Sequence, residues 1–94
     1  MAVGVREADT ITVEFFGPFR EFGKETAVRA DGPVSFDRLV AMLTERLGGP
    51  FEERARRSNT TLIVNNRIVS RQRLAEVEIR PGDTVSFALL MGGG

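Results

Sequence analysis

The residues best suited to chemistry are three consecutive glycines, Gly92, Gly93 and Gly94, which follow an apolar segment at the end of the 94-residue sequence. Glycine has no Cβ and accepts φ of either sign, so we expect residues 91–94 to form a slender, flexible tail. Its one reactive group is the terminal carboxylate of Gly94, an anion at neutral pH. Such a tail can enter the narrow active site of another protein and be modified there. A frayed terminus or a cloning remnant is the alternative.

The composition narrows the chemistry that the rest of the chain can supply. It has no cysteine and no histidine, which excludes thiol nucleophiles, the usual zinc ligands and the commonest general base. Basic and acidic residues balance at 13 each, so charge gives no reason to expect binding to nucleic acid or to a membrane. Residues 1–9 lack the apolar core of a signal peptide, and no segment is long enough to span a bilayer. The sequence therefore predicts a cytoplasmic domain that binds no metal or cofactor itself.

The first half of the sequence predicts two strands and one helix. Alternating apolar residues favour a strand over residues 10–16, and a second strand over residues 25–30 completes a hairpin. Ser35 is a suitable N-cap, and Gly48-Gly49-Pro50 ends the helix that follows it. The apolar positions of this helix recur at three- and four-residue intervals: Phe36, Leu39, Val40, Leu43 and Leu47.

The second half predicts a short helix and three further strands. The helix covers residues 51–57, and the strands cover residues 60–64, 68–69 and 84–90. Asn65-Asn66 is typical of a tight hairpin turn, because asparagine tolerates positive φ, and Pro81-Gly82-Asp83 indicates another turn. This element order predicts an α+β, β-grasp fold, with the last strand central in a mixed sheet and one main helix on one face. We expect residues 1–9 to be disordered, residues 10–90 to form the domain and residues 91–94 to form the tail.

Other polar clusters have simpler explanations than catalysis. Arg54, Arg56 and Arg57 are interpreted as a solvated helix face rather than an anion site. Asp37 and the Glu52-Glu53 pair are explained by helix capping and solvated charge rather than by acid–base or metal chemistry.

Four motifs resemble those of ubiquitin-like sulfur carriers, the family of molybdopterin-synthase small subunits and thiamine-thiazole sulfur carriers. TVEFFGPFREFG at residues 12–23 is similar to the opening strand and Arg-Glu turn of the molybdopterin-synthase small subunits. VNNRIV at residues 64–69 resembles the "VNGxxV" hairpin of both branches, with Asn66 in place of the usual glycine. IRPGDTV at residues 79–85 resembles their turn into the last strand, and Gly93-Gly94 matches their terminal diglycine.

The resemblance implies a carrier that is not itself an enzyme. A partner adenylating enzyme would use ATP and Mg²⁺ to activate the carboxylate of Gly94, and a sulfurtransferase would then supply sulfur to form a thiocarboxylate. The sulfur would pass to a larger synthase subunit or another acceptor. Residues 12–23 favour molybdopterin synthesis slightly, whereas the closing Met-Gly-Gly-Gly favours the thiazole pathway, and tRNA thiolation is a further alternative.

Two further hypotheses use the same tail differently. In one, the activated glycine is passed to a lysine of a target, as in a protein modifier. In the other, the domain is a β-grasp interaction module with an inert tail. For a carrier or modifier, we expect Gly92 and Gly93 to thread the channel of the partner. Leu90 and Met91 would form an apolar patch beside the tail, which Phe16 or Phe19 would extend, with ordinary core packing as the alternative.

Overall fold

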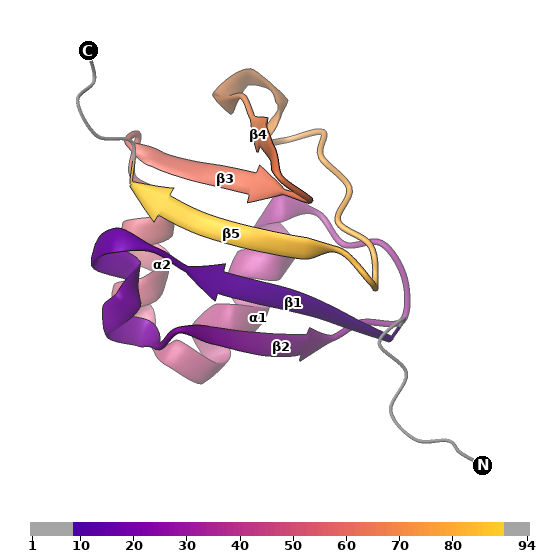
Figure 1. Ribbon diagram of the computed structural model, residues 1–94, viewed down its shortest axis with the longest axis horizontal. Helices are drawn as coiled ribbons and strands as arrows, with labels where there is room; N and C mark the ends of the chain where they lie inside the picture. Colours follow the sequence, from indigo (N-terminus) through magenta and orange to yellow (C-terminus); the bar gives the residue numbers. More distant parts are fainter. Residues whose placement is uncertain (1–8, 90–94) are drawn as a thin grey trace.

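The computed structural model describes residues 9–89, and its main element is one five-stranded mixed sheet. The strand order is β2-β1-β5-β3-β4, in which β1 and β5 are parallel and the other neighbours are antiparallel (Figure 1). The strands are β1 (Thr10–Phe15), β2 (Glu25–Arg29), β3 (Thr60–Val64), β4 (Arg67–Val69) and β5 (Thr84–Leu89). The last strand is therefore central, which confirms the predicted β-grasp fold.

Two helices cover one face of this sheet (Figure 1). The main helix, α1 (Phe36–Leu47), begins after Ser35, whose hydroxyl oxygen accepts a hydrogen bond of 3.0 Å from the Arg38 N–H. Gly48, at φ 96°, ends α1 and leads into the shorter α2 (Gly49–Ala55). Both helices were predicted, although α2 begins two residues earlier and ends two residues earlier than expected. No helix of residues 9–89 is long and apolar enough to cross a membrane.

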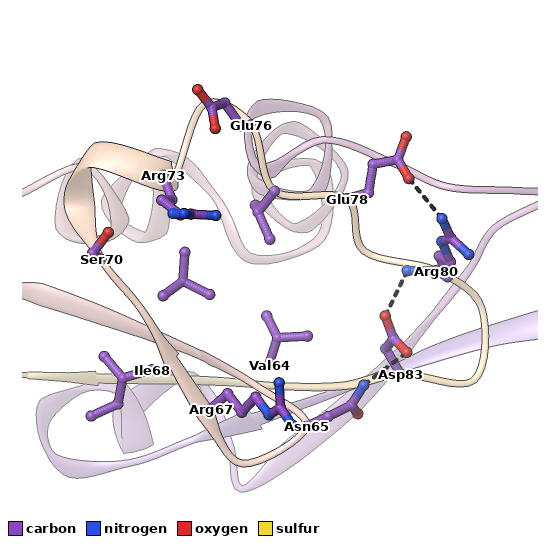
Figure 2. Close-up of a pocket in the computed structure, with 12 residues that line it drawn as sticks. Val64, Asn65, Arg67, Ile68, Ser70, Arg73, Glu76, Glu78, Arg80 and Asp83 are labelled. Carbon is purple, nitrogen blue, oxygen red and sulfur yellow. Dashed lines mark hydrogen bonds and ion pairs between the residues drawn. The ribbon is translucent and has the colours of Figure 1, made fainter.

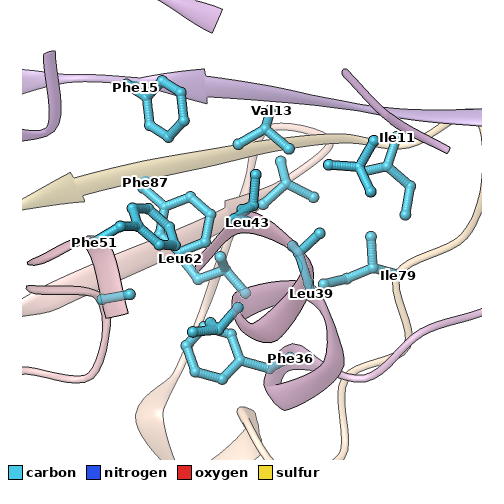
Figure 3. Packing of buried hydrophobic residues seen from close by; sticks show 14 of the residues in the cluster. Ile11, Val13, Phe15, Phe36, Leu39, Leu43, Phe51, Leu62, Ile79 and Phe87 are labelled. Carbon is cyan, nitrogen blue, oxygen red and sulfur yellow. The ribbon is translucent and has the colours of Figure 1, made fainter. Parts of the chain in front are cut away.

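Five phenylalanine rings fill the core between the helices and the end of the sheet where β1 and β5 finish. The Phe87 ring of β5 lies 5.2 Å from that of Phe51 on α2, at an interplanar angle of 75° (Figure 3). It lies 5.6 Å from the ring of Phe19. Phe15 and Phe22 complete the cluster around Phe51, with ring centroids 6.1 Å and 5.4 Å away. Each buried ring of this kind contributes about 2–3 kcal/mol by removal of apolar surface from water.

The segment between β1 and β2, which the sequence predicted only as the connection of a hairpin, has regular structure of its own. It forms a 3₁₀ helix, η2 (Gly17–Phe22), with Pro18 in its first turn. Residues 70–80 contain a second, shorter 3₁₀ helix, η3 (Arg71–Arg73), and then Ile79 exchanges two backbone hydrogen bonds with Val34. Strand β2 ends at Arg29 rather than Ala30, and the predicted end of the last strand, Leu90, lies outside the described residues.

The Asn65-Asn66 turn joins β3 to β4 and also holds the start of β5. Both residues have positive φ, 51° and 71°, as the sequence predicted. The Asn65 side chain donates to Asp83 and accepts from the Thr84 N–H, both at 2.9 Å, so the hairpin is fastened to the turn before β5. Asp83 N–H also donates to Arg80 O at 2.9 Å across Pro81 and Gly82, which confirms the second predicted turn.

Replacement of Asn66 tests this turn. We expect Asn66→Val to lower the free energy of unfolding by about 1–2 kcal/mol, because a β-branched residue disfavours left-handed backbone. Asn66→Gly, which accepts this φ freely, should leave stability unchanged or raise it. Urea denaturation of the two variants and the wild type measures the difference, and equal losses for valine and glycine would contradict this account of the turn.

Candidate functional site

The face of the sheet away from the helices, which we call the open face, is the candidate site. Side chains alternate along each strand, so those between the buried residues of β1, β3 and β5 point to this face. The pairing of the strands then defines which of them are neighbours. The open face carries Thr12, Glu14 and Phe16 in line with β1, Ser86 and Ala88 on β5, Thr61 and Ile63 on β3, and Ile68 on β4.

Four apolar residues of the open face form what we call the apolar strip: Phe16, Ala88, Ile63 and Ile68. Phe16 extends the line of β1, because its N–H donates a hydrogen bond of 3.0 Å to Phe87 O. Ile63 pairs with both Ser86 and Ile68, while Ala88 pairs with Thr61 one step further along the sheet. Phe16 is 41% exposed and Ile68 is 73% exposed, the two large apolar side chains of residues 9–89 that stand most open to water.

Arg20 holds Phe16 in place at one end of the strip. Its Nε donates a hydrogen bond of 2.7 Å to Phe15 O, and its guanidinium carbon lies 5.9 Å from the centre of the Phe16 ring. The cation therefore lies against the ring that faces solvent, an attractive arrangement at an exposed site. A rigid aromatic side chain beside a fixed cation is a suitable anchor for a protein partner.

The other half of the open face is charged. A hollow of about 360 Å³ beside Phe16 is lined by side chains of both signs, among them Glu14, Arg20, Lys24 and Glu25. The Ser86 hydroxyl donates a hydrogen bond of 3.2 Å to Glu14 and so links β5 to β1 across this face. The open face thus combines an apolar strip with a polar margin, as protein-binding surfaces do.

The predicted site residues fall into three groups: the residues of the tail, the exposed Phe16 and the buried Phe19. Leu90, Met91, Gly92, Gly93 and Gly94 lie outside the described residues, and their roles stay predictions. Phe16 is exposed at the end of β1, where a partner can reach it. The predicted boundaries of the disordered segment (residues 1–9) and of the tail (residues 91–94) also stay predictions.

Phe19 requires a correction. We expected it to extend the docking patch, with core packing as the alternative, and its side chain has no exposed surface at all. It lies in η2, which turns it inward against Phe51 and Phe87. The proposed partner contact of Phe19 is therefore wrong for this conformation, and the core alternative holds.

The basic cluster on α2 ties neighbouring elements together. Arg54 pairs with Glu21, donates a hydrogen bond of 2.8 Å to Pro18 O and covers the Phe22 ring, so it fastens α2 to η2. Arg56 pairs with Asp37 and Glu52, and these carboxylates raise the pKa of Arg56, with the hydrogen bond that Arg56 donates to Asp37 as the largest cause. Among residues 9–89, no three carboxylate, histidine or cysteine side chains are grouped to hold a metal ion.

Sequence reasoning missed Arg20, Ile63 and Ile68 as parts of the site. The alternation of side chains along β4 could have predicted the exposure of Ile68. Val69 faces the core, so its neighbour Ile68 faces the opposite side of the sheet. The sequence did not give the full order of the strands in space. It therefore did not show whether other elements would cover the open face.

The fold is that of a ubiquitin-like β-grasp protein. A family model described as "ThiS family" matches residues 13–94, and the chain belongs to this family of ubiquitin-like sulfur carriers. Among curated proteins, none matches the chain in sequence.

Several solved structures share the fold. A thiamine biosynthesis protein (ThiS) from Geobacter metallireducens is 22% identical, with a TM-score of 0.56 over 90% of this chain and 99% of that one. The HVO 2177 protein of Haloferax volcanii is 20% identical, with a TM-score of 0.73 over 100% of this chain and 94% of that one. The small archaeal modifier protein 1 (SAMP1) of Methanosarcina acetivorans is 15% identical, with a TM-score of 0.67 over 90% and 96%. At these identities, the likeness shows the fold alone.

A pair of substitutions tests the assignment of Ile68 to the surface and Phe19 to the core. We expect Ile68→Ala to change the free energy of unfolding by no more than about 0.5 kcal/mol, because the side chain is mostly exposed. Phe19→Ala should cost about 3–5 kcal/mol, because it leaves a cavity among aromatic rings. Chemical denaturation measures both values, and a similar loss for the two variants would contradict the assignment.

Proposed function

We propose that this chain is a sulfur carrier whose Gly94 carboxylate is activated by a partner enzyme and converted to a thiocarboxylate. The observation that carries the proposal is the family match over residues 13–94, which includes the three glycines. The apolar strip supports the proposal, because it includes Ala88 near the end of β5, and the glycine tail follows β5 in the sequence.

The chemistry requires a partner because a carboxylate is a poor electrophile. ATP, held with Mg²⁺ by the adenylating enzyme, converts the carboxylate of Gly94 to an acyl-adenylate and releases pyrophosphate. A sulfurtransferase then supplies sulfur at the oxidation level of sulfide, which attacks the acyl carbon to form the C–S bond, and the C–O bond to AMP breaks, so that AMP leaves with one of the former carboxylate oxygens. This chain has no cysteine or histidine, so the catalytic groups belong to the partners and the chain acts as a co-substrate.

The open face suits the docking of the adenylating enzyme. Phe16 and Ile68 offer exposed apolar surface, and Arg20 and Lys24 offer cations at the margin. Burial of exposed aromatic and aliphatic side chains within a polar rim is the usual source of affinity in protein complexes. Leu90 and Met91, next in sequence after β5, extend this apolar surface toward the glycines in the proposal.

We propose molybdopterin or the thiazole of thiamine as the destination of the sulfur, with tRNA thiolation as a further alternative. The motif of residues 12–23 favours a larger molybdopterin-synthase subunit as the acceptor, slightly, because it spans more residues than the closing Met-Gly-Gly-Gly. The names of the matching family and of the Geobacter thiamine biosynthesis protein favour the thiazole pathway. Protein modification is a second candidate function, which the likeness to two small archaeal modifier proteins supports.

Activation of the tail provides the test. With the host's adenylating enzyme and ATP, we expect Gly93→Ala to lower the rate of pyrophosphate release about 100-fold, because a Cβ displaces the reacting carboxylate in a narrow channel. Deletion of Gly94 should abolish the reaction. Gly32→Ala is the matched control, since a Cβ at Gly32 meets no atom within 4 Å. Wild-type rates in the Gly93 variant, or equal losses in both alanine variants, would sink the proposal.

A further inference from the structure

The five-stranded sheet has two outer edges, β4 and β2, and they differ in what lies beside them (Figure 1). Between β4 and residues 76–83 there is a hollow of about 930 Å³ (Figure 2). Three arginines and three carboxylates line this hollow: Arg67, Arg73, Arg80, Glu76, Glu78 and Asp83. Because these charges balance, they favour no particular partner. The edge of β2 carries a more specific arrangement.

The pairing of β2 with β1 determines which backbone groups of β2 face outward. Phe15 N–H donates to Lys24 O and Ala30 N–H donates to Asp9 O, both at 3.0 Å. In an antiparallel pair, such hydrogen-bonded positions alternate with positions whose N–H and C=O point away from the partner strand. The positions of β2 that direct their N–H and C=O to the outer edge are therefore Glu25, Ala27 and Arg29.

Arg46, in the last turn of α1, covers the centre of this edge. Its Nη1 donates a hydrogen bond of 2.8 Å to Ala27 O and one of 3.0 Å to Thr26 Oγ1. A donor of the same chain thus occupies the central acceptor of the edge, and a cation lies where another strand would have to approach. Charged side chains protect edge strands from pairing with other chains in this way.

The residues on either side of Ala27 match a second copy of the same strand. If two copies of β2 pair antiparallel about a two-fold axis at Ala27, Glu25 of each copy lies opposite Arg29 of the other. All three residues have outward backbone groups, so this register also satisfies the hydrogen bonds of the ladder. Both charged side chains are exposed, and neither has an ion pair within residues 9–89. Opposite charges across a strand pair are stabilising, and the two-fold axis makes the pair twice.

The position of Arg46 opposes this association. The two-fold axis passes through Ala27, so the guanidinium groups that are held at Ala27 O in both copies would meet beside the axis. Like charges repel there, and each guanidinium would have to give up its hydrogen bond to Ala27 O before the strands could pair. The flanking charges therefore favour association, whereas Arg46 at the centre prevents it.

We propose that the outer edge of β2 is a self-complementary interface for a second copy of this chain, and that Arg46 keeps this interface closed. Release of Arg46 lets two β2 strands join into one continuous sheet, with a Glu25–Arg29 pair on each side of the axis. Glu25 pairs with Glu14 of the open face, so the open faces of the two copies would then lie side by side. The inference does not depend on sulfur transfer.

Removal of the Arg46 side chain tests the proposal on the full chain. We expect Arg46→Ala to self-associate at least about 10-fold more tightly than the wild type, a difference of about 1.4 kcal/mol, as measured by analytical ultracentrifugation. The Ala27 amide should become protected from hydrogen exchange as the dimer forms. Arg38→Ala is the matched control, because it removes an exposed arginine from the same helix, and it should associate no more tightly than the wild type.

Charge variants distinguish this pairing from non-specific association. In the Arg46→Ala background, Arg29→Glu sets two carboxylates opposite each other and should abolish the gain in association. The exchange Glu25→Arg/Arg29→Glu in the same background should restore it. Three results would overturn the proposal: equal association of Arg46→Ala and the wild type, a gain that survives Arg29→Glu alone, or an equal gain in Arg38→Ala. A wild-type chain that already pairs through Ala27 would contradict the role given to Arg46.

Discussion

The parallel pairing of β1 with β5, fixed by the rings of Phe15 and Phe87, is the constraint on which the rest of the structure depends. The two rings lie in register on neighbouring strands and stack at 6.4 Å, with Phe51 against both of them (Figure 3). A strand that is paired on both sides and buried on its core face cannot shift by one residue without exposing these rings. The central position of β5 therefore fixes where the chain leaves the sheet.

The same pairing also builds the open face. Because side chains alternate, a register that buries Phe15 and Phe87 places Phe16 and Ala88 on the opposite side. Arg54 supports this arrangement from the helical layer, since it joins α2 to η2, the segment that carries Arg20. One strand register therefore determines both the packing of the core and the position of the apolar strip, so a change in the core should also affect the apolar strip.

Local signals in the sequence predicted most of the fold. The stripe from Phe36 to Leu47, the Ser35 cap and the two asparagines with positive φ specify their elements from residues close in sequence. The inward turn of Phe19 was not predictable in this way, because a 3₁₀ helix and the distant Phe51 and Phe87 rings decide its direction. The exposure of Ile68 likewise follows from strand order, and the hollow between β4 and residues 76–83 follows from contacts between segments that lie apart in the sequence.

The mass of the intact protein tests the central claim most directly. The chain is incubated with its adenylating enzyme, ATP, Mg²⁺ and a sulfur donor, and then analysed by mass spectrometry. The account predicts a gain equal to the replacement of one oxygen by sulfur, located at Gly94 by fragmentation and absent without ATP. An unchanged mass, with an enzyme and donor shown to be active on another carrier, would contradict it.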